Sequence, residues 1–175
     1  MPLTPATETD IQVVSKQLGR PARDIVAIAA RCVCGKPTVV QTAPRLSDGT
    51  PFPTTYYMTH PGATAAFSRL EAAGLMAELQ ERLAVDQELA EAYRLAHEAY
   101  LADRAELLAA TGDVPEIEGI SAGGMPTRVK CLHALAGHAL AAGPGVNPIG
   151  DIALELCTWS PDRCVCSVTT DVTNQ

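Results

Sequence analysis

Apolar positions near the N-terminus first repeat at helical spacing and then form short continuous runs. Thr9 and Gln12 form a capping-box pattern at the start of the helical repeat, and Gly19 stands where such a helix would end. The runs that follow are "DIVAIA", "PTVVQTAP" and "TTYYMTH", which are separated by turn residues. Three strands in a row without a helix between them predict a small antiparallel or mixed sheet in the N-terminal half.

From Pro61 onward, apolar residues return at the spacing of helices that pack on a core. Asp86 is placed to cap a long helix that ends at Gly112. A loop with two adjacent glycines follows, and Pro126 stands at the first position of a helix that runs to about Ala142. Helices are therefore expected to dominate the rest of the chain.

The length of 175 residues fits one domain with a single core. We assign residues 1–158 to one helix-dominated α+β domain, with the three-stranded sheet in its N-terminal half. Residues 159–175 are polar, and we expect them to form a flexible C-terminal tail.

Charge and hydropathy argue against two classes of protein. A formal net charge of −7 argues against broad nucleic-acid binding, because such binding neutralises phosphates with Lys and Arg. No apolar run approaches the roughly 20 residues that cross a bilayer, and "MPLTPATETD" lacks the basic start and apolar stretch of a signal peptide. We therefore expect a cytoplasmic protein that does not enter membranes.

The six cysteines carry the main chemical signal. In a reducing cytosol, clustered cysteines more often bind metal or do redox chemistry than form disulfides. Cys32 and Cys34 extend a predicted strand, so their thiols point to one face about 6.5 Å apart, and Gly35 permits a tight turn after them. Such a pair could hold a metal ion, with packing in the core as the alternative for each thiol.

Cys131 lies on the helix that is predicted after the glycine loop. On a regular helix, His138 lies about 10.5 Å further along the axis, and His133 lies about 160° around it. Neither histidine can then share a metal ion with Cys131. The partners of Cys131 are therefore expected to come from the sheet region.

His60 ends the third predicted strand, and Cys32 and Cys34 end the first. If these two strand ends converge with the start of the later helix, they bring together three thiols and one imidazole. The predicted metal set is Cys32, Cys34, His60 and Cys131. Its composition suits a zinc ion or an iron–sulfur cluster, and the sequence leaves open which of the two is bound.

The C-terminal part of the chain holds a rival pair of thiols. Cys164 and Cys166 form a second Cys-x-Cys sequence, but they lie in the polar segment that is expected to be flexible. We therefore rank this pair below the predicted set. Cys157 falls in an apolar run and is expected in the core.

The loop "SAGGMPTRVK" predicts a pocket for a small anion. Gly123 and Gly124 precede a helix, where free backbone N–H groups and the helix dipole favour negative charge. Arg128 and Lys130 add positive charge beside them. The spacing is not that of a P-loop, and a tight turn is the alternative interpretation. If an anionic or phosphate-type ligand binds there, His133 is the candidate acid or base.

Three segments of the chain resemble a known family. They are "RCVCGKPTVVQTAPRLSDGTPFPTTYYMTHP", "GISAGGMPTRVKCLHALAGH" and "GPGVNPIGD", and the family is the bacterial, largely actinobacterial, domain of unknown function 501. The resemblance implies that cysteine can stand in place of His60, which supports the metal set, and that Cys34 is not a fixed member of it. It brings no activity with it. Neighbouring genes of the family imply a link with cell division.

Three hypotheses follow. The first is a cytoplasmic metal-binding protein with a small anionic ligand in the glycine loop. Three protein ligands to its metal would favour an enzyme, whereas four would favour a structural site. The second is a helical module that binds a protein partner in cell division, with a structural metal or none. The third is a binder of phosphate compounds without metal. An exposed apolar stripe would favour the second, and its candidates are Leu79, Leu83, Leu89, Tyr93 and Leu101.

Overall fold

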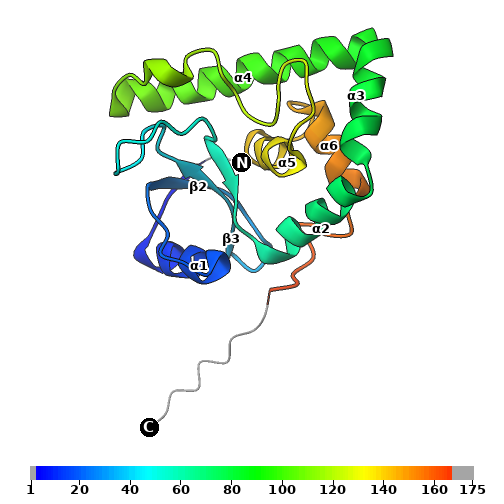
Figure 1. Ribbon diagram of the computed structural model, residues 1–175. Coiled ribbons are helices and arrows are strands. Elements are labelled where there is room, and N and C mark those ends of the chain that lie inside the picture. Colours follow the sequence, from blue (N-terminus) through cyan, green and yellow to red (C-terminus); the bar gives the residue numbers. More distant parts are fainter. Residues whose placement is uncertain (1–2, 167–175) are drawn as a thin grey trace.

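The structure is a computed structural model that describes residues 3–166, and it has an α+β fold (Figure 1). Its antiparallel sheet has the strand order β1-β2-β3-β4. The strands are β1 (Thr4–Pro5), β2 (Ile25–Arg31), β3 (Pro37–Thr42) and β4 (Tyr56–Met58). The helices of the described residues are α1 (Glu8–Leu18), α2 (Pro61–Ala72), α3 (Leu75–Val85), α4 (Gln87–Thr111), the 3₁₀ helix η1 (Pro115–Ile117), α5 (Leu132–Ala142) and α6 (Pro148–Leu156). The predicted helix-dominated α+β fold is therefore confirmed.

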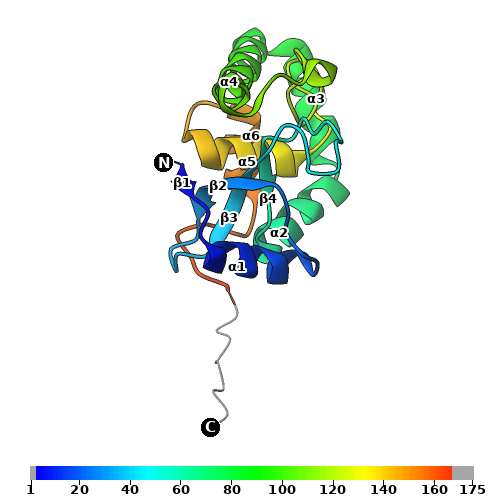
Figure 2. The ribbon, with the colours of Figure 1, turned by 90° about the vertical axis from the view of Figure 1, so that its left-hand side faces the viewer.

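The sheet lies between two helical layers (Figure 2). Helix α1 covers one face, and α5, which packs against α6, covers the other. Because side chains alternate between the two faces of a strand, Ile28 and Val40 pack with Val14 of α1. Their neighbours Ala29 and Val39 belong to the larger core under the other helices. All of β3 is buried, since both of its faces are covered.

Helices α3 and α4 lie on the far side of α5 from the sheet (Figure 1). They bury most of the apolar stripe that could have marked a partner-binding surface. Leu79, Leu83, Leu89 and Tyr93 are in the core, and Leu101 is half-buried. The stripe therefore serves packing inside the domain. Within residues 3–166, no helix combines the length and the apolar character that crossing a bilayer requires.

Three expectations about element boundaries differ from the structure. The capping box of α1 is made by Thr7 and Asp10, two residues before the predicted pair. The sheet has a fourth strand, β1, which is too short to show in the pattern. Helix α5 begins at Leu132 and not near Pro126, because residues 123–130 fold into a hydrogen-bonded turn ahead of it.

The C-terminal segment, residues 157–166, packs against the domain. Trp159 is 5% exposed, and its ring centroid lies 5.4 Å from that of His60. The N–H of Val33, in the turn between β2 and β3, donates to the carbonyl of Pro161 at 2.9 Å. Trp159 and Pro161, which belong to the segment expected to be flexible, thus contact the rest of the domain, and residues 167–175 lie outside the described residues.

Candidate metal centres

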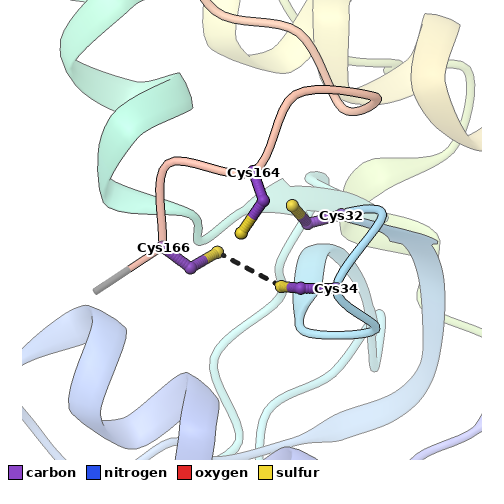
Figure 3. A group of neighbouring side chains, drawn as sticks. All are labelled: Cys32, Cys34, Cys164 and Cys166. Atoms are coloured by element: carbon purple, nitrogen blue, oxygen red, sulfur yellow. Dashed lines mark hydrogen bonds between the residues drawn. The ribbon is translucent and has the colours of Figure 1, made fainter. Parts of the chain in front are cut away.

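Four cysteines from two distant segments meet at one end of the sheet (Figure 3). They are Cys32, Cys34, Cys164 and Cys166, and we call them the four-cysteine group. Their sulfur atoms all lie within 4.8 Å of one another, and those of Cys34 and Cys166 are 3.5 Å apart. One pair comes from the turn between β2 and β3, and the other comes from the C-terminal segment. The Cys-x-Cys pair that was ranked lower on the sequence is therefore half of this group.

The turn that carries Cys32 and Cys34 is closed by its own backbone. The N–H of Cys32 donates to the carbonyl of Lys36 at 2.9 Å, and the N–H of Gly35 donates to the carbonyl of Cys32 at 2.8 Å. Gly35 has a φ of 87°, which glycine adopts without a steric penalty. This turn presents both thiols toward the C-terminal segment, as Figure 3 shows.

An ion pair between Asp10 and Arg31 stabilises the same turn. Both oxygens of Asp10 accept from the guanidinium of Arg31, at 2.6 and 3.0 Å. Arg31 also donates to the carbonyl of Gly35 at 2.9 Å. The hydrogen bond from Arg31 holds the pKa of Asp10 well below its usual range. Helix α1 is thereby tied to the turn that carries two of the cysteines.

His60 touches the four-cysteine group without being one of its members. Its Nδ1 accepts from the N–H groups of Gly62 and Ala63 at 3.1 and 3.3 Å, so it caps α2. The ring proton of the neutral imidazole is then assigned to Nε2, which lies 3.0 Å from the sulfur of Cys166. Burial lowers the pKa of His60, which favours this neutral form. The structure thus places His60 as a hydrogen-bond donor to a cysteine of the group.

The thiols of the four-cysteine group influence one another's charge. Burial, and then the contact with Cys34, raise the pKa of Cys166, and burial also raises that of Cys32. Burial acts on Cys34 in the same direction, but the N–H of Lys36 and the neighbouring thiols outweigh it and lower its pKa to about 7. One thiolate therefore forms easily, whereas several thiolates side by side require a cation.

The distances within the four-cysteine group suit one ion. Zinc bonds to thiolate sulfur at about 2.3 Å, so two sulfurs of a tetrahedral site lie about 3.8 Å apart. The 3.5 Å between Cys34 and Cys166 is close to that value. Thiolates are also ligands that soft and borderline metal ions prefer. The group is therefore compatible with metal binding.

Cys131 lies elsewhere, in a second group with Glu71 and His133. Their ligand atoms lie within 4.8 Å of one another. The sulfur of Cys131 is 4.0 Å from Nδ1 of His133, and this nitrogen is 3.1 Å from Oε1 of Glu71. The expectation of a regular helix through Cys131, on which His133 would point away from it, was wrong. Because α5 begins at Leu132, Cys131 is extended, with φ −156° and ψ 108°, and its side chain turns toward His133.

Two further contacts fix the positions of these side chains. Oε1 of Glu71 accepts from the N–H of Leu132 at 2.8 Å and so caps α5 from another helix. Nε2 of His133 lies 3.1 Å from the carbonyl oxygen of Thr64. The contact with Cys131 and the charge of Glu71 raise the pKa of His133 to about 9. Burial raises the pKa of Cys131, but His133 and the N–H of Ala134 outweigh it, so this pKa is lowered.

The glycine loop closes on itself. The carbonyls of Gly124 and Gly123 accept from the N–H groups of Arg128 and Lys130, both at 2.8 Å. A Cβ on Gly123 would lie 2.6 Å from the side chain of Leu135, and one on Gly124 would lie 2.5 Å from the carbonyl oxygen of Arg128. These contacts account for both glycines as parts of a tight turn. The side chains of Arg128 and Lys130 are exposed, and the anion pocket stays a prediction.

Comparisons with curated proteins and with solved structures gave no match. A family model does match, over residues 28–155. The matched stretch contains the whole second group and only half of the four-cysteine group, since Cys164 and Cys166 lie beyond its end. The match covers more than half of the chain and agrees with the resemblance found in the sequence. The chain belongs to the family described as Protein of unknown function (DUF501).

Proposed function

We propose that this protein binds one zinc ion through Cys32, Cys34, Cys164 and Cys166, and that the ion fastens the C-terminal segment to the sheet. The observation that carries this proposal is the meeting of two Cys-x-Cys pairs within 4.8 Å. The backbone supports it, because the hydrogen bond between Val33 and Pro161 joins the same two segments.

The spacing of the sulfurs favours a single ion over a cluster. In a cluster with four irons, each cysteine binds a different iron, so the cysteine sulfurs lie farther apart than around one ion. Four thiolates on one zinc ion make a closed site, which is typical of structural zinc. The proposed role is therefore structural. It also implies a reducing compartment such as the cytoplasm, since the thiols must stay unoxidised.

Metal analysis of anaerobically purified protein, with an absorbance spectrum of the same sample, tests the proposal. We expect zinc without visible colour. Cys34→Ser and Cys164→Ser should each lose one zinc ion per chain. Cys157→Ser is the matched control, because the thiol of Cys157 is half-buried in the same segment but bonds to the carbonyl of Trp159 at 2.9 Å. It should keep its zinc.

Two results would overturn the proposal. Iron with sulfide and a brown chromophore would show that the thiols hold a cluster. Equal zinc contents in wild type, Cys34→Ser and Cys164→Ser would show that the four-cysteine group holds no ion.

A further inference from the structure

We propose that Glu71, Cys131 and His133 form a second metal site, which binds a divalent ion such as zinc and leaves a coordination position open. This site shares no residue with the four-cysteine group and does not rest on the function proposed above. Its three donors are an oxygen, a sulfur and a nitrogen, which are the three kinds of atom that zinc accepts from proteins.

The distances in the second group agree with one tetrahedral ion. Usual zinc bond lengths place sulfur and nitrogen ligands about 3.6 Å apart, and nitrogen and oxygen ligands about 3.4 Å apart. The sulfur of Cys131 and Nδ1 of His133 are 4.0 Å apart. Nδ1 of His133 and Oε1 of Glu71 are 3.1 Å apart. Shifts of a few tenths of an ångström would bring these two pairs to the distances around one ion, and the sulfur of Cys131 and the carboxylate of Glu71 lie within 4.8 Å of each other.

The imidazole of His133 is oriented as a metal ligand needs it. A histidine that binds metal through one ring nitrogen donates the proton of the other, often to a backbone carbonyl. The carbonyl oxygen of Thr64 can only accept, so the proton on Nε2 is directed toward it at 3.1 Å. Nδ1 then faces Cys131 and Glu71. The carbonyl oxygen of Thr64 thus determines that Nδ1 of His133, and not Nε2, faces the second group. No feature of the sequence indicates this contact.

The other two ligands stand at ends of helices that pack together. Glu71 lies in the last turn of α2 and is anchored by the N–H of Leu132. Cys131 is the residue before α5, where the N-terminus of the helix stabilises a thiolate. Both positions are set by the packing of α2 against α5, so the site is organised before an ion binds.

Three protein ligands leave a fourth position for water or a small ligand, as in catalytic zinc sites. The side chains of Glu71 and His133 keep 23% and 22% of their surface exposed. Solvent therefore reaches the group. The four-cysteine group, in contrast, already supplies four ligands.

Cobalt(II) binding to the full chain tests this site separately from the first. In a background that carries both Cys164→Ser and Cys166→Ser, where only two thiols of the four-cysteine group remain, we expect one cobalt ion per chain with a charge-transfer band from one thiolate. Thiocyanate should change this spectrum, because it can enter the open position. Adding Cys131→Ser should abolish the thiolate band.

Glu71→Gln provides the variant that keeps the fold. Its amide oxygen can still accept from the N–H of Leu132, so α5 stays capped while the anionic ligand is lost. We expect its cobalt affinity to fall about tenfold or more. His97→Gln, which changes a half-buried histidine that bonds to Ser121, is the control and should bind cobalt as the background does.

The proposal is overturned if the background with Cys164→Ser and Cys166→Ser binds no cobalt, or if neither Cys131→Ser nor Glu71→Gln weakens the binding. A spectrum that does not respond to thiocyanate would overturn the open position. If instead the four-cysteine group holds no ion, metal analysis gives a different result. The protein would then hold one ion that depends on Cys131 and not on Cys34 or Cys164.

Discussion

The two groups of metal-ligand side chains differ in how the chain builds them. The four-cysteine group joins two short turns that are far apart in sequence, and its donors are all thiols. The second group lies between two packed helices and mixes three kinds of donor. A full set of like donors suits an ion that holds segments together, and a partial, mixed set suits an ion that meets a further ligand. The two proposed ions would therefore differ in role, the first holding segments together and the second binding a further ligand.

The groups also differ in what they contribute to stability. Cys34 and Cys166 are 132 residues apart, so an ion between them restricts a long loop of the unfolded chain. Helices α2 and α5 are already joined by the bond from Leu132 to Glu71. Removing the ion from the first group should therefore destabilise the protein more than removing it from the second.

Zinc removal should have the largest effect. If free zinc stands at about 1,000 times its Kd, a strong chelator should lower the free energy of unfolding by about 4 kcal/mol. Urea denaturation measures this change. Trp159 is the only tryptophan of the chain and is 5% exposed, so its fluorescence should shift to the red as the C-terminal segment is released.

Two variants test whether the loss of stability on chelation comes from the ion at the four-cysteine group. Cys131→Ser should respond to the chelator as wild type does, because its four-cysteine group is intact. Cys164→Ser should start at lower stability, and its tryptophan emission should not change on chelation. If Cys164→Ser responded to the chelator and Cys131→Ser did not, the ion that stabilises the fold would belong to the second group.

His60 should affect zinc affinity at the first group only. His60→Ala removes the donor to Cys166, and loss of such an outer contact weakens metal binding about 10- to 100-fold. It also removes the cap of α2, which should cost about 1 kcal/mol of unfolding free energy. Competition with a chelator measures the affinity, and urea denaturation measures the stability.

His60→Asn separates the two roles of this histidine. The amide oxygen of asparagine can cap α2, but the side chain is too short to reach Cys166 as well. We expect wild-type stability in the metal-free state and the weakened affinity of His60→Ala. Zinc affinity equal to that of wild type would mean that the contact with Cys166 does not support the ion.

Much of the fold could be predicted from the sequence because local patterns determine it. The runs around Ile28 and Val39 gave the central strands, and Asp86 caps α4 as its position indicated. The start of α5 could not be found in this way. The turn of residues 123–130 precedes it, and the carboxylate of Glu71 accepts from the N–H of Leu132 from another helix, which leaves no local signal.

The candidate site was predicted only in part. Cys32 and Cys34 belong to the four-cysteine group and Cys131 belongs to the second group, whereas His60 belongs to neither and only contacts Cys166. The repeat of Cys-x-Cys at Cys164 is a usable signal, but it ranks below the predicted set as long as the polar segment is expected to be flexible. Glu71 gave no signal, since a glutamate in a helix is ordinarily solvated. Tertiary contacts decided each of these outcomes.

Asp10→Asn should weaken the turn that carries Cys32 and Cys34 and leave the second group unchanged. The change removes the charge that holds Arg31 beside the turn of Cys32 and Cys34, so we expect a loss of about 1–2 kcal/mol at neutral pH. Glu8→Gln, an exposed change in the same first turn of α1, is the control and should cost less. Urea denaturation over a range of pH measures both.

The pH dependence follows from the lowered pKa of Asp10. A carboxyl whose pKa is lower in the folded than in the unfolded state stabilises the protein above its unfolded value of 3.8, and this stability is lost as the pH falls through the folded value. The difference between wild type and Asp10→Asn should therefore be constant above about pH 5 and shrink below about pH 4. If Asp10→Asn also weakened cobalt binding at Glu71, Cys131 and His133, the two groups would be coupled through the sheet, and their roles could not be assigned separately.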